Sequence, residues 1–179
     1  MKTKYVAAVV VIILAAGIGS FAYYNEGQNV GSMSLSVADL GISGVSAVYI
    51  TFSDFSTHKA PANGSTNSNN GGWSNYSVST KTVDILNLSQ SNASLLGKMS
   101  LTAGTYTMFR LYITNVTVVV SGVHISLTLK APFAFVTHAI KISAHSTTNV
   151  VFDFNLHTDM AISGTAGIFT PNVGTVYVS

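Results

Sequence analysis

The chain has 179 residues, no cysteine and a formal net charge of +2, and only 8% of its residues are charged. The lack of cysteine excludes disulfide bonds, and so small and scattered a positive charge argues against a nucleic acid partner. Glu26 is the only glutamate, so the fold depends little on ionised carboxylates. Because acid unfolds proteins largely by protonating paired carboxylates, this composition suits an acidic exterior.

The first segment, residues 5–24, is an almost continuous apolar run that follows Lys2 and Lys4. A basic start, an apolar core and then small residues are typical of an export signal. Ser20-Phe21-Ala22 has the small-x-small pattern that signal peptidases cleave, so we predict a signal over residues 1–22, cleavage after Ala22, and an extracellular location at the cell surface. The run is also long enough to span a bilayer, which takes about 20 residues, so an uncleaved membrane anchor is the alternative.

Beyond a predicted flexible linker at residues 23–31, the apolar residues recur with period two rather than with a helical period. Met33, Leu35 and Val37 alternate with small residues, which predicts a strand with one apolar face. Further strands are predicted at residues 48–53, 73–79, 82–87, 105–120, 123–129, 135–143, 149–156 and 175–178.

Two other segments separate these strands: a predicted short helical turn at residues 88–96 and a polar Asn/Gly/Ser loop at residues 61–72. No amphipathic helix is predicted after residue 24. Frequent short strands and turns are typical of sandwiches, so residues 32–179 are predicted to form one all-β domain, a Greek-key (immunoglobulin-like) β-sandwich.

Five Asn-x-Ser/Thr sequons occur, at Asn63, Asn75, Asn87, Asn92 and Asn115. Chance sequons are common in a chain this rich in Asn, Ser and Thr, but export would expose them to a compartment where N-linked glycans are added. Asn63, Asn75 and Asn92 lie in or beside predicted loops and are the strongest candidates. Asn115 lies within a strand and can be modified only if its side chain faces solvent.

Motifs for catalysis, cofactors and metals are absent from the sequence. The five histidines are far apart, and one glutamate cannot supply a pair of catalytic glutamates. Asp153-x-Asn155-x-His157-x-Asp159 has oxygen-bearing side chains at alternate positions, as in a calcium loop, but lacks the loop's glycine and final glutamate. We therefore predict no enzyme, cofactor or metal site; an Asp–His pair assembled only by folding is the one catalytic arrangement left open.

Several short motifs follow one another in a characteristic order: a strand ending in Asp39, then Thr82–Leu88, a small-Gly-x-Tyr turn at Ala103–Tyr106, the Asp-containing strand Val150–Phe154, and Pro171. In this order and spacing they resemble an uncharacterised family of exported β-sandwich domains that is common in archaea. The resemblance covers most of residues 32–179 and implies the same fold.

Within that family, the chain resembles the subunit of the thin surface filaments called threads in thermoacidophilic archaea. The shared features are an export signal, a single low-charge β-domain and many sequons. The resemblance implies a head-to-tail homopolymer in which each subunit receives an N-terminal donor strand from its neighbour. Met33, Leu35 and Val37 are then the donor-strand residues, and Asn25–Gly31 is the segment expected to let the strand leave its own domain. The sequence alone equally allows residues 32–39 to pair within their own sheet.

The predicted function is therefore a structural subunit of an extracellular surface filament. One alternative is a membrane-anchored or secreted binding module for carbohydrate, in which Trp73, Tyr76 and the loop at residues 61–72 form a sugar platform. Trp73 could equally fill the core. Another alternative is a type IV pilin, in which cleavage would follow Lys4 and residues 5–24 would form an unusually short stem.

Overall fold

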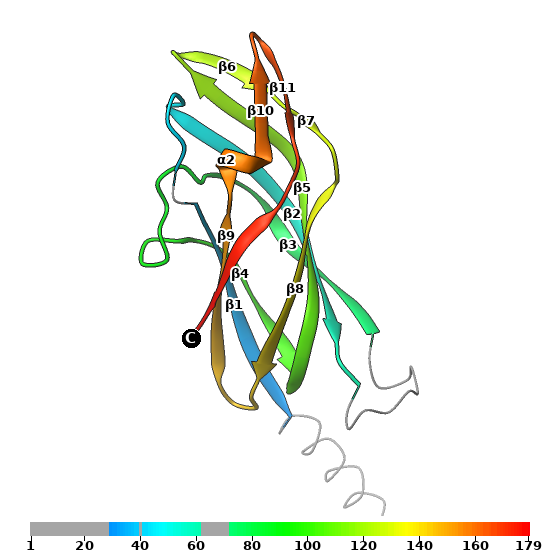
Figure 1. Cartoon of the computed structure of the whole chain (residues 1–179). Coiled ribbons are helices and arrows are strands. Elements are labelled where there is room, and N and C mark those ends of the chain that lie inside the picture. The colour runs from blue at the N-terminus through cyan, green and yellow to red at the C-terminus, as the bar shows by residue number, and fades with distance from the viewer. Residues whose placement is uncertain (1–28, 40, 62–71) are drawn as a thin grey trace, which may run out of the picture.

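The computed structural model describes residues 29–39, 41–61 and 72–179 (Figure 1). The predicted signal or anchor at residues 1–22, most of the linker, the loop at residues 62–71 and the sequon at Asn63 lie outside the described residues. No helix in the described part of the chain is long and apolar enough to cross a membrane.

The described residues are almost entirely β-structure, which confirms the all-β prediction. The elements are β1 (Val30–Asp39), β2 (Ala47–Lys59), β3 (Gly72–Asp84), β4 (Ser94–Thr102), β5 (Gly104–Val120), β6 (Val123–Ser126), β7 (Thr128–Leu129), β8 (Phe133–Ile142), β9 (Thr147–Phe154), the short helix α2 (Leu156–Asp159), β10 (Met160–Ser163), β11 (Ala166–Phe169) and β12 (Val173–Val178).

Two large sheets make up the body of the domain. The first has the order β12-β9-β1-β4, with β1 parallel to β9 and antiparallel to β4. The second has the order β3-β2-β5-β6, and β8 pairs with the first half of the long strand β5. A small third sheet, β10-β11-β7, lies at the end of the domain opposite to the start of β1 (Figure 1).

The two large sheets pack face to face, as in a sandwich. Phe152 of the first sheet contacts Phe55 and Phe109 of the second, with ring centroids 6.1 Å and 5.9 Å apart. From β1, the side chains of Met33, Leu35 and Val37 enter this core and are fully buried. Burying side chains of this size stabilises a fold by about 1.5–3 kcal/mol each. Because all three are buried, the period-two pattern correctly identified the inward face of β1.

Several predicted boundaries differ from the structure. β1 begins at Val30, two residues before the predicted domain boundary. The strands predicted at residues 73–79 and 82–87 merge into one strand, β3, which ends at Asp84, three residues before the predicted end. The predicted helical turn at residues 88–96 is wrong: turns occupy its first part and β4 begins at Ser94. Side-chain chemistry explains this, because the Asn92 carboxamide accepts hydrogen bonds from the backbone and hydroxyl of Ser89 and so competes with a helix.

The small-Gly-x-Tyr motif makes the turn between β4 and β5. Gly104 has φ of 151°, and a Cβ at this position would lie 2.6 Å from Cε of Lys59. The buried Tyr106 donates its hydroxyl hydrogen bond back to the carbonyl of Thr102 over 2.9 Å. This motif therefore has a structural role, because glycine permits the turn and tyrosine closes it.

Candidate functional site

The first candidate site is the slot that β1 fills between β4 and β9. Met33 lies opposite Met99 of β4, and Val37 lies beside Phe152 of β9. Backbone hydrogen bonds on both edges and buried side chains on one face are the interactions that a donated strand would make. In the single chain described here, however, β1 pairs within its own sheet, which is the arrangement that the sequence left open as the alternative to donation.

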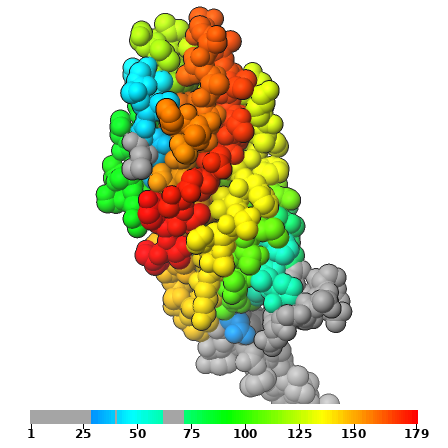
Figure 2. Space-filling model, in the orientation of Figure 1, coloured from blue at the N-terminus to red at the C-terminus, as the bar shows by residue number. Residues whose placement is uncertain are grey.

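Most of β1 is covered by other elements. In the view of Figure 2, the atoms of β1 reach the surface only near the start of the strand, at the lower end of the domain. Since β1 is the first strand of the domain, its covalent link to the other strands is the segment 40–46. The expectation that Asn25–Gly31 lets the strand leave its own domain stays a prediction, since residues 25–28 lie outside the described residues. Val30 and Gly31 already belong to β1, and the segment that joins β1 to β2 follows the strand.

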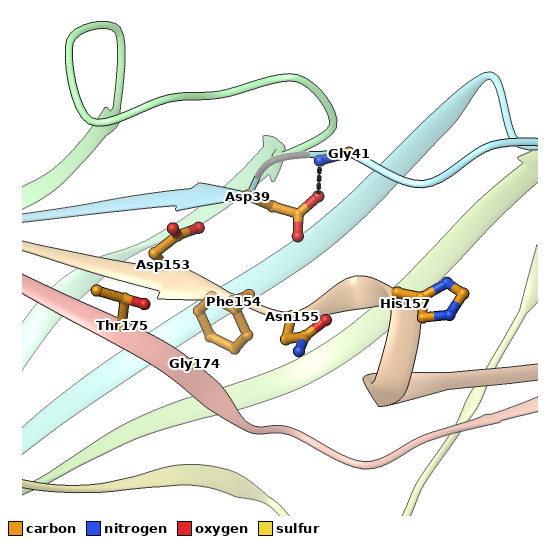
Figure 3. A pocket seen from close by; sticks show the side chains of 8 residues that line it. All are labelled: Asp39, Gly41, Asp153, Phe154, Asn155, His157, Gly174 and Thr175. Carbon is orange, nitrogen blue, oxygen red and sulfur yellow. Dashed lines mark hydrogen bonds between the residues drawn. The ribbon is translucent and has the colours of Figure 1, made fainter.

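The second candidate site is a pocket of about 170 Å³ at the C-terminal end of β1 (Figure 3). Its lining includes Asp39 from β1, Asp153 from β9, and Asn155 and His157, which follow β9. The parallel pairing of β1 with β9 places Ala38 beside Asp153, so the ends of the two strands meet here. The two aspartates that marked separate motifs in the sequence are thus brought together by the fold.

Asp39 organises the backbone around this pocket. Its Oδ2 accepts a hydrogen bond from the backbone N–H of Gly41 over 2.6 Å (Figure 3), and its Oδ1 accepts one from the N–H of Leu156 over 3.1 Å. Gly41 has φ of 88°, a conformation that favours glycine. Asp39 therefore ties the start of the β1–β2 connection to the start of α2.

A third carboxyl, that of Asp159, lies close by and is 3% exposed. Burial raises its pKa to about 7, although the backbone N–H of Asn172 donates a hydrogen bond to its Oδ2 over 3.2 Å and favours the ionised form. Burial also raises the pKa of Asp39 and of Asp153, and for Asp153 the nearby charge of Asp39 raises it further. This group of three, the acidic corner, therefore binds protons more tightly than free aspartates do.

The carboxyls of Asp39 and Asp159 in the acidic corner act as hydrogen-bond acceptors. Within residues 29–39, 41–61 and 72–179, no group of three or more His, Cys, Asp or Glu side chains is placed to hold a metal ion. In the calcium-like stretch, α2 occupies Leu156–Asp159, and the carboxyl of Asp159 bonds to Thr158 and Asn172. Asp153 and Asp159 lie in one short stretch of the sequence, whereas Asp39 lies far upstream, so only the fold brings the three carboxyls of the corner together.

The four sequons within the described chain all expose their asparagine: Asn75, Asn87, Asn92 and Asn115. Asn75 and Asn115 lie within strands, and the condition set for Asn115, a side chain that faces solvent, is met. Exposure makes modification sterically possible at each of these positions.

Trp73 and Tyr76 do not share a face, as the sugar platform would require, and most of the loop predicted to complete the platform lies outside the described residues. Trp73 lies opposite His58 on the outer face of the second sheet and is 37% exposed, whereas Tyr76 lies opposite the fully buried Phe55 and packs against the core. The two rings therefore point to opposite faces of β3, as expected for residues an odd number of positions apart in a strand. Trp73 does not fill the core either; instead, the Arg110 guanidinium lies 3.8 Å from its ring centroid.

Comparison with known families identifies one domain over most of the described chain. Residues 30–170 match the family model described as "Domain of unknown function (DUF4382)". The chain belongs to the DUF4382 family. The matched DUF4382 region begins at the first residue of β1, so it includes β1, and it contains both Asp39 and Asp153 as well as Asp159. No curated protein and no solved structure matches the chain.

Proposed function

We propose that this DUF4382 protein is a structural subunit of an extracellular surface filament, thread-like in type, and that its subunits are joined by exchange of β1. The observation that carries the proposal is the position of β1: it is the first strand of the domain, yet it lies between two other strands at the centre of its sheet. The export signal expected from the sequence would deliver the domain to the cell surface.

Exchange would preserve the interactions that β1 makes now. A copy of β1 supplied by a neighbour can form the same hydrogen bonds to β4 and β9 and bury the same Met33, Leu35 and Val37 side chains. The balance between the closed and exchanged forms then depends mainly on the connection at residues 40–46 and on protein concentration.

The connection sets the geometry of the filament. Seven extended residues reach at most about 25 Å, so a subunit that donates β1 must lie directly beside its acceptor. Each subunit has one strand to donate and one slot to fill, which is a heterologous contact that generates an open chain unless the rotation closes a ring. Asp39 holds the start of this connection in the closed form through Gly41, so the exchanged form must break or remake that hydrogen bond.

Cysteine cross-linking tests the proposal, because the native chain has no cysteine. Ser34 of β1 lies opposite Lys98 of β4. Exported full-length S34C and K98C variants are mixed under assembly conditions and oxidised, and exchange predicts a covalent S34C–K98C dimer. The matched control is S34C with S94C, because Ser94 pairs with Val37, about 10 Å further along β1.

The double variant S34C/K98C completes the test. Exchange predicts a covalent ladder of oligomers, and electron microscopy should show filaments in the same sample. If the double variant forms only an intramolecular disulfide and the mixed single variants stay monomeric, β1 remains in its own sheet and exchange is wrong.

The second candidate function is a membrane-anchored or secreted carbohydrate-binding module. The observation that favours it is that Trp73 and Phe135, 37% and 47% exposed, lie near each other on the outer face of the second sheet. A depletion assay with insoluble polysaccharide, comparing the natural chain with W73A, distinguishes the two candidates. Retention that depends on Trp73, in a protein that does not polymerise, would favour the binding module.

A further inference from the structure

One patch on the outer face of the second sheet combines exposed aromatic rings with an arginine. Trp73 of β3 and Phe135 of β8 have ring centroids 6.3 Å apart. Between the strands that carry them, Arg110 of β5 places its guanidinium carbon 3.8 Å from the Trp73 ring centroid and 5.3 Å from that of Phe133. Trp73 nevertheless remains 37% exposed. We call these four residues the aromatic patch.

A sequon lies on the same face, directly beside this patch. Asn75 follows Trp73 by two residues in β3, so both side chains project from the outer face, about 6.6 Å apart along the strand. The cross-strand partners agree, because Trp73 lies opposite His58 and Asn75 lies opposite Ser56. Ser56 donates its hydroxyl hydrogen bond to Oδ1 of Asn75 over 2.7 Å, which leaves Nδ2, the atom that carries an N-linked sugar, outside this contact.

We propose that Asn75 carries an N-linked glycan whose first sugar rings fold back onto the aromatic patch and cover Trp73. A pyranose ring has an apolar C–H face that packs well on an aromatic ring, and its hydroxyl groups accept hydrogen bonds from a guanidinium such as that of Arg110. Because the sugar is covalently attached about 6.6 Å from the ring, its effective concentration at Trp73 is in the millimolar range or above. The partner of this exposed surface is therefore part of the same molecule.

The other described sequons lack this arrangement. The residue two positions before Asn115 is Ile113, which is 2% exposed, and the residue two positions before Asn87 is Ile85, which is fully buried. Gln90 stands two positions before Asn92, in a turn. Among the described sequons, Asn75 alone has an exposed aromatic ring two residues earlier on a strand.

The chain provides its own reporter, because Trp73 is its only tryptophan. The full-length protein is secreted from a host that adds N-linked glycans, and the quenching of Trp73 fluorescence by acrylamide is compared in the natural chain, N75Q and N115Q. N75Q should raise the quenching constant about twofold, because a ring covered on its free side becomes open to the quencher. N115Q, the matched strand sequon, should leave quenching unchanged.

Enzymatic release of the glycans from the natural chain should give the same rise as N75Q, which separates loss of the sugar from any effect of the substitution. Equal quenching before and after release, or glycopeptide mass spectrometry that finds Asn75 unmodified, would overturn the inference. N,N′-diacetylchitobiose added to the deglycosylated protein should protect Trp73 from acrylamide again only at millimolar concentrations. Protection at micromolar concentrations would show a site built for a free sugar and would also overturn the inference.

This inference rests on the export that the proposed function assumes, but not on exchange of β1. The two can therefore fail separately. Absence of S34C–K98C cross-linking would leave the glycan result unaffected, and unchanged Trp73 quenching would leave the filament result unaffected.

Discussion

Asp159 is predicted to make the domain more stable in acid than at neutral pH. Burial raises its pKa from the ordinary 3.8 to about 7. Between these values the folded state keeps a proton that the unfolded chain has lost, so the free energy of unfolding decreases as the pH rises. The stabilisation is fully present below about pH 4 and is lost as the pH rises through about 7. Asp39 and Asp153 act in the same direction, because burial raises their pKa values too.

The size of the effect follows from the shift in pKa. One pKa unit corresponds to about 1.36 kcal/mol, so a shift of roughly three units sets an upper limit of about 4 kcal/mol. Solvent screening at a corner that adjoins an open pocket lowers this value, and we expect about 1–2 kcal/mol between pH 4 and pH 8 from Asp159. Most small domains behave differently, with maximal stability between about pH 5 and pH 8.

Urea unfolding of the exported domain at pH 4, 6 and 8, followed by circular dichroism, measures this dependence. D159N cannot titrate, so its free energy of unfolding should vary less with pH than that of the natural chain and should exceed it at pH 8. D84N is the control, because Asp84 is exposed and accepts hydrogen bonds from the backbone of Val48 and Leu86. If the natural chain is equally stable at pH 4 and pH 8, or if D159N keeps its full pH dependence, burial does not control this carboxyl.

Three further substitutions test the fold and the aromatic patch. Leu35→Ala, at a fully buried position of β1, should destabilise the domain by about 2–5 kcal/mol in urea unfolding, and an unchanged midpoint would place the side chain outside the core. Tyr106→Phe removes the hydrogen bond to Thr102 and should cost about 0.5–1.5 kcal/mol, with full stability contradicting a role for the hydroxyl in the turn. Arg110→Ala should shift the emission maximum of Trp73 and alter its quenching, because the guanidinium lies over the ring; an identical spectrum would place Arg110 elsewhere in solution.

Local pattern was enough to predict the strands and several of their details. The alternation of Met33, Leu35 and Val37 correctly gave the inward face of β1, because side chains of a strand alternate whatever its partners are. The gap between the strands predicted at residues 105–120 and 123–129 is likewise a tight hairpin turn in the structure, where Ser121 and Gly122 have positive φ, 50° and 81°. Where short-range side-chain bonds compete with the backbone, as at Ser89 and Asn92, the prediction failed.

Only the tertiary structure decided which strands became neighbours and what their outer faces contacted. β1 pairs with β4 and with β9, which lie more than 50 and more than 100 residues further along the chain, and a period of two contains no information about such partners. For the same reason, neither the meeting of Asp39 with Asp153 nor the packing of Arg110 on Trp73 could be predicted. The sequence by itself determined an all-β chain with an apolar first strand, because alternation is a local property. The acidic corner and the aromatic patch depend on pairing across the sheets, which forms only when the whole chain folds.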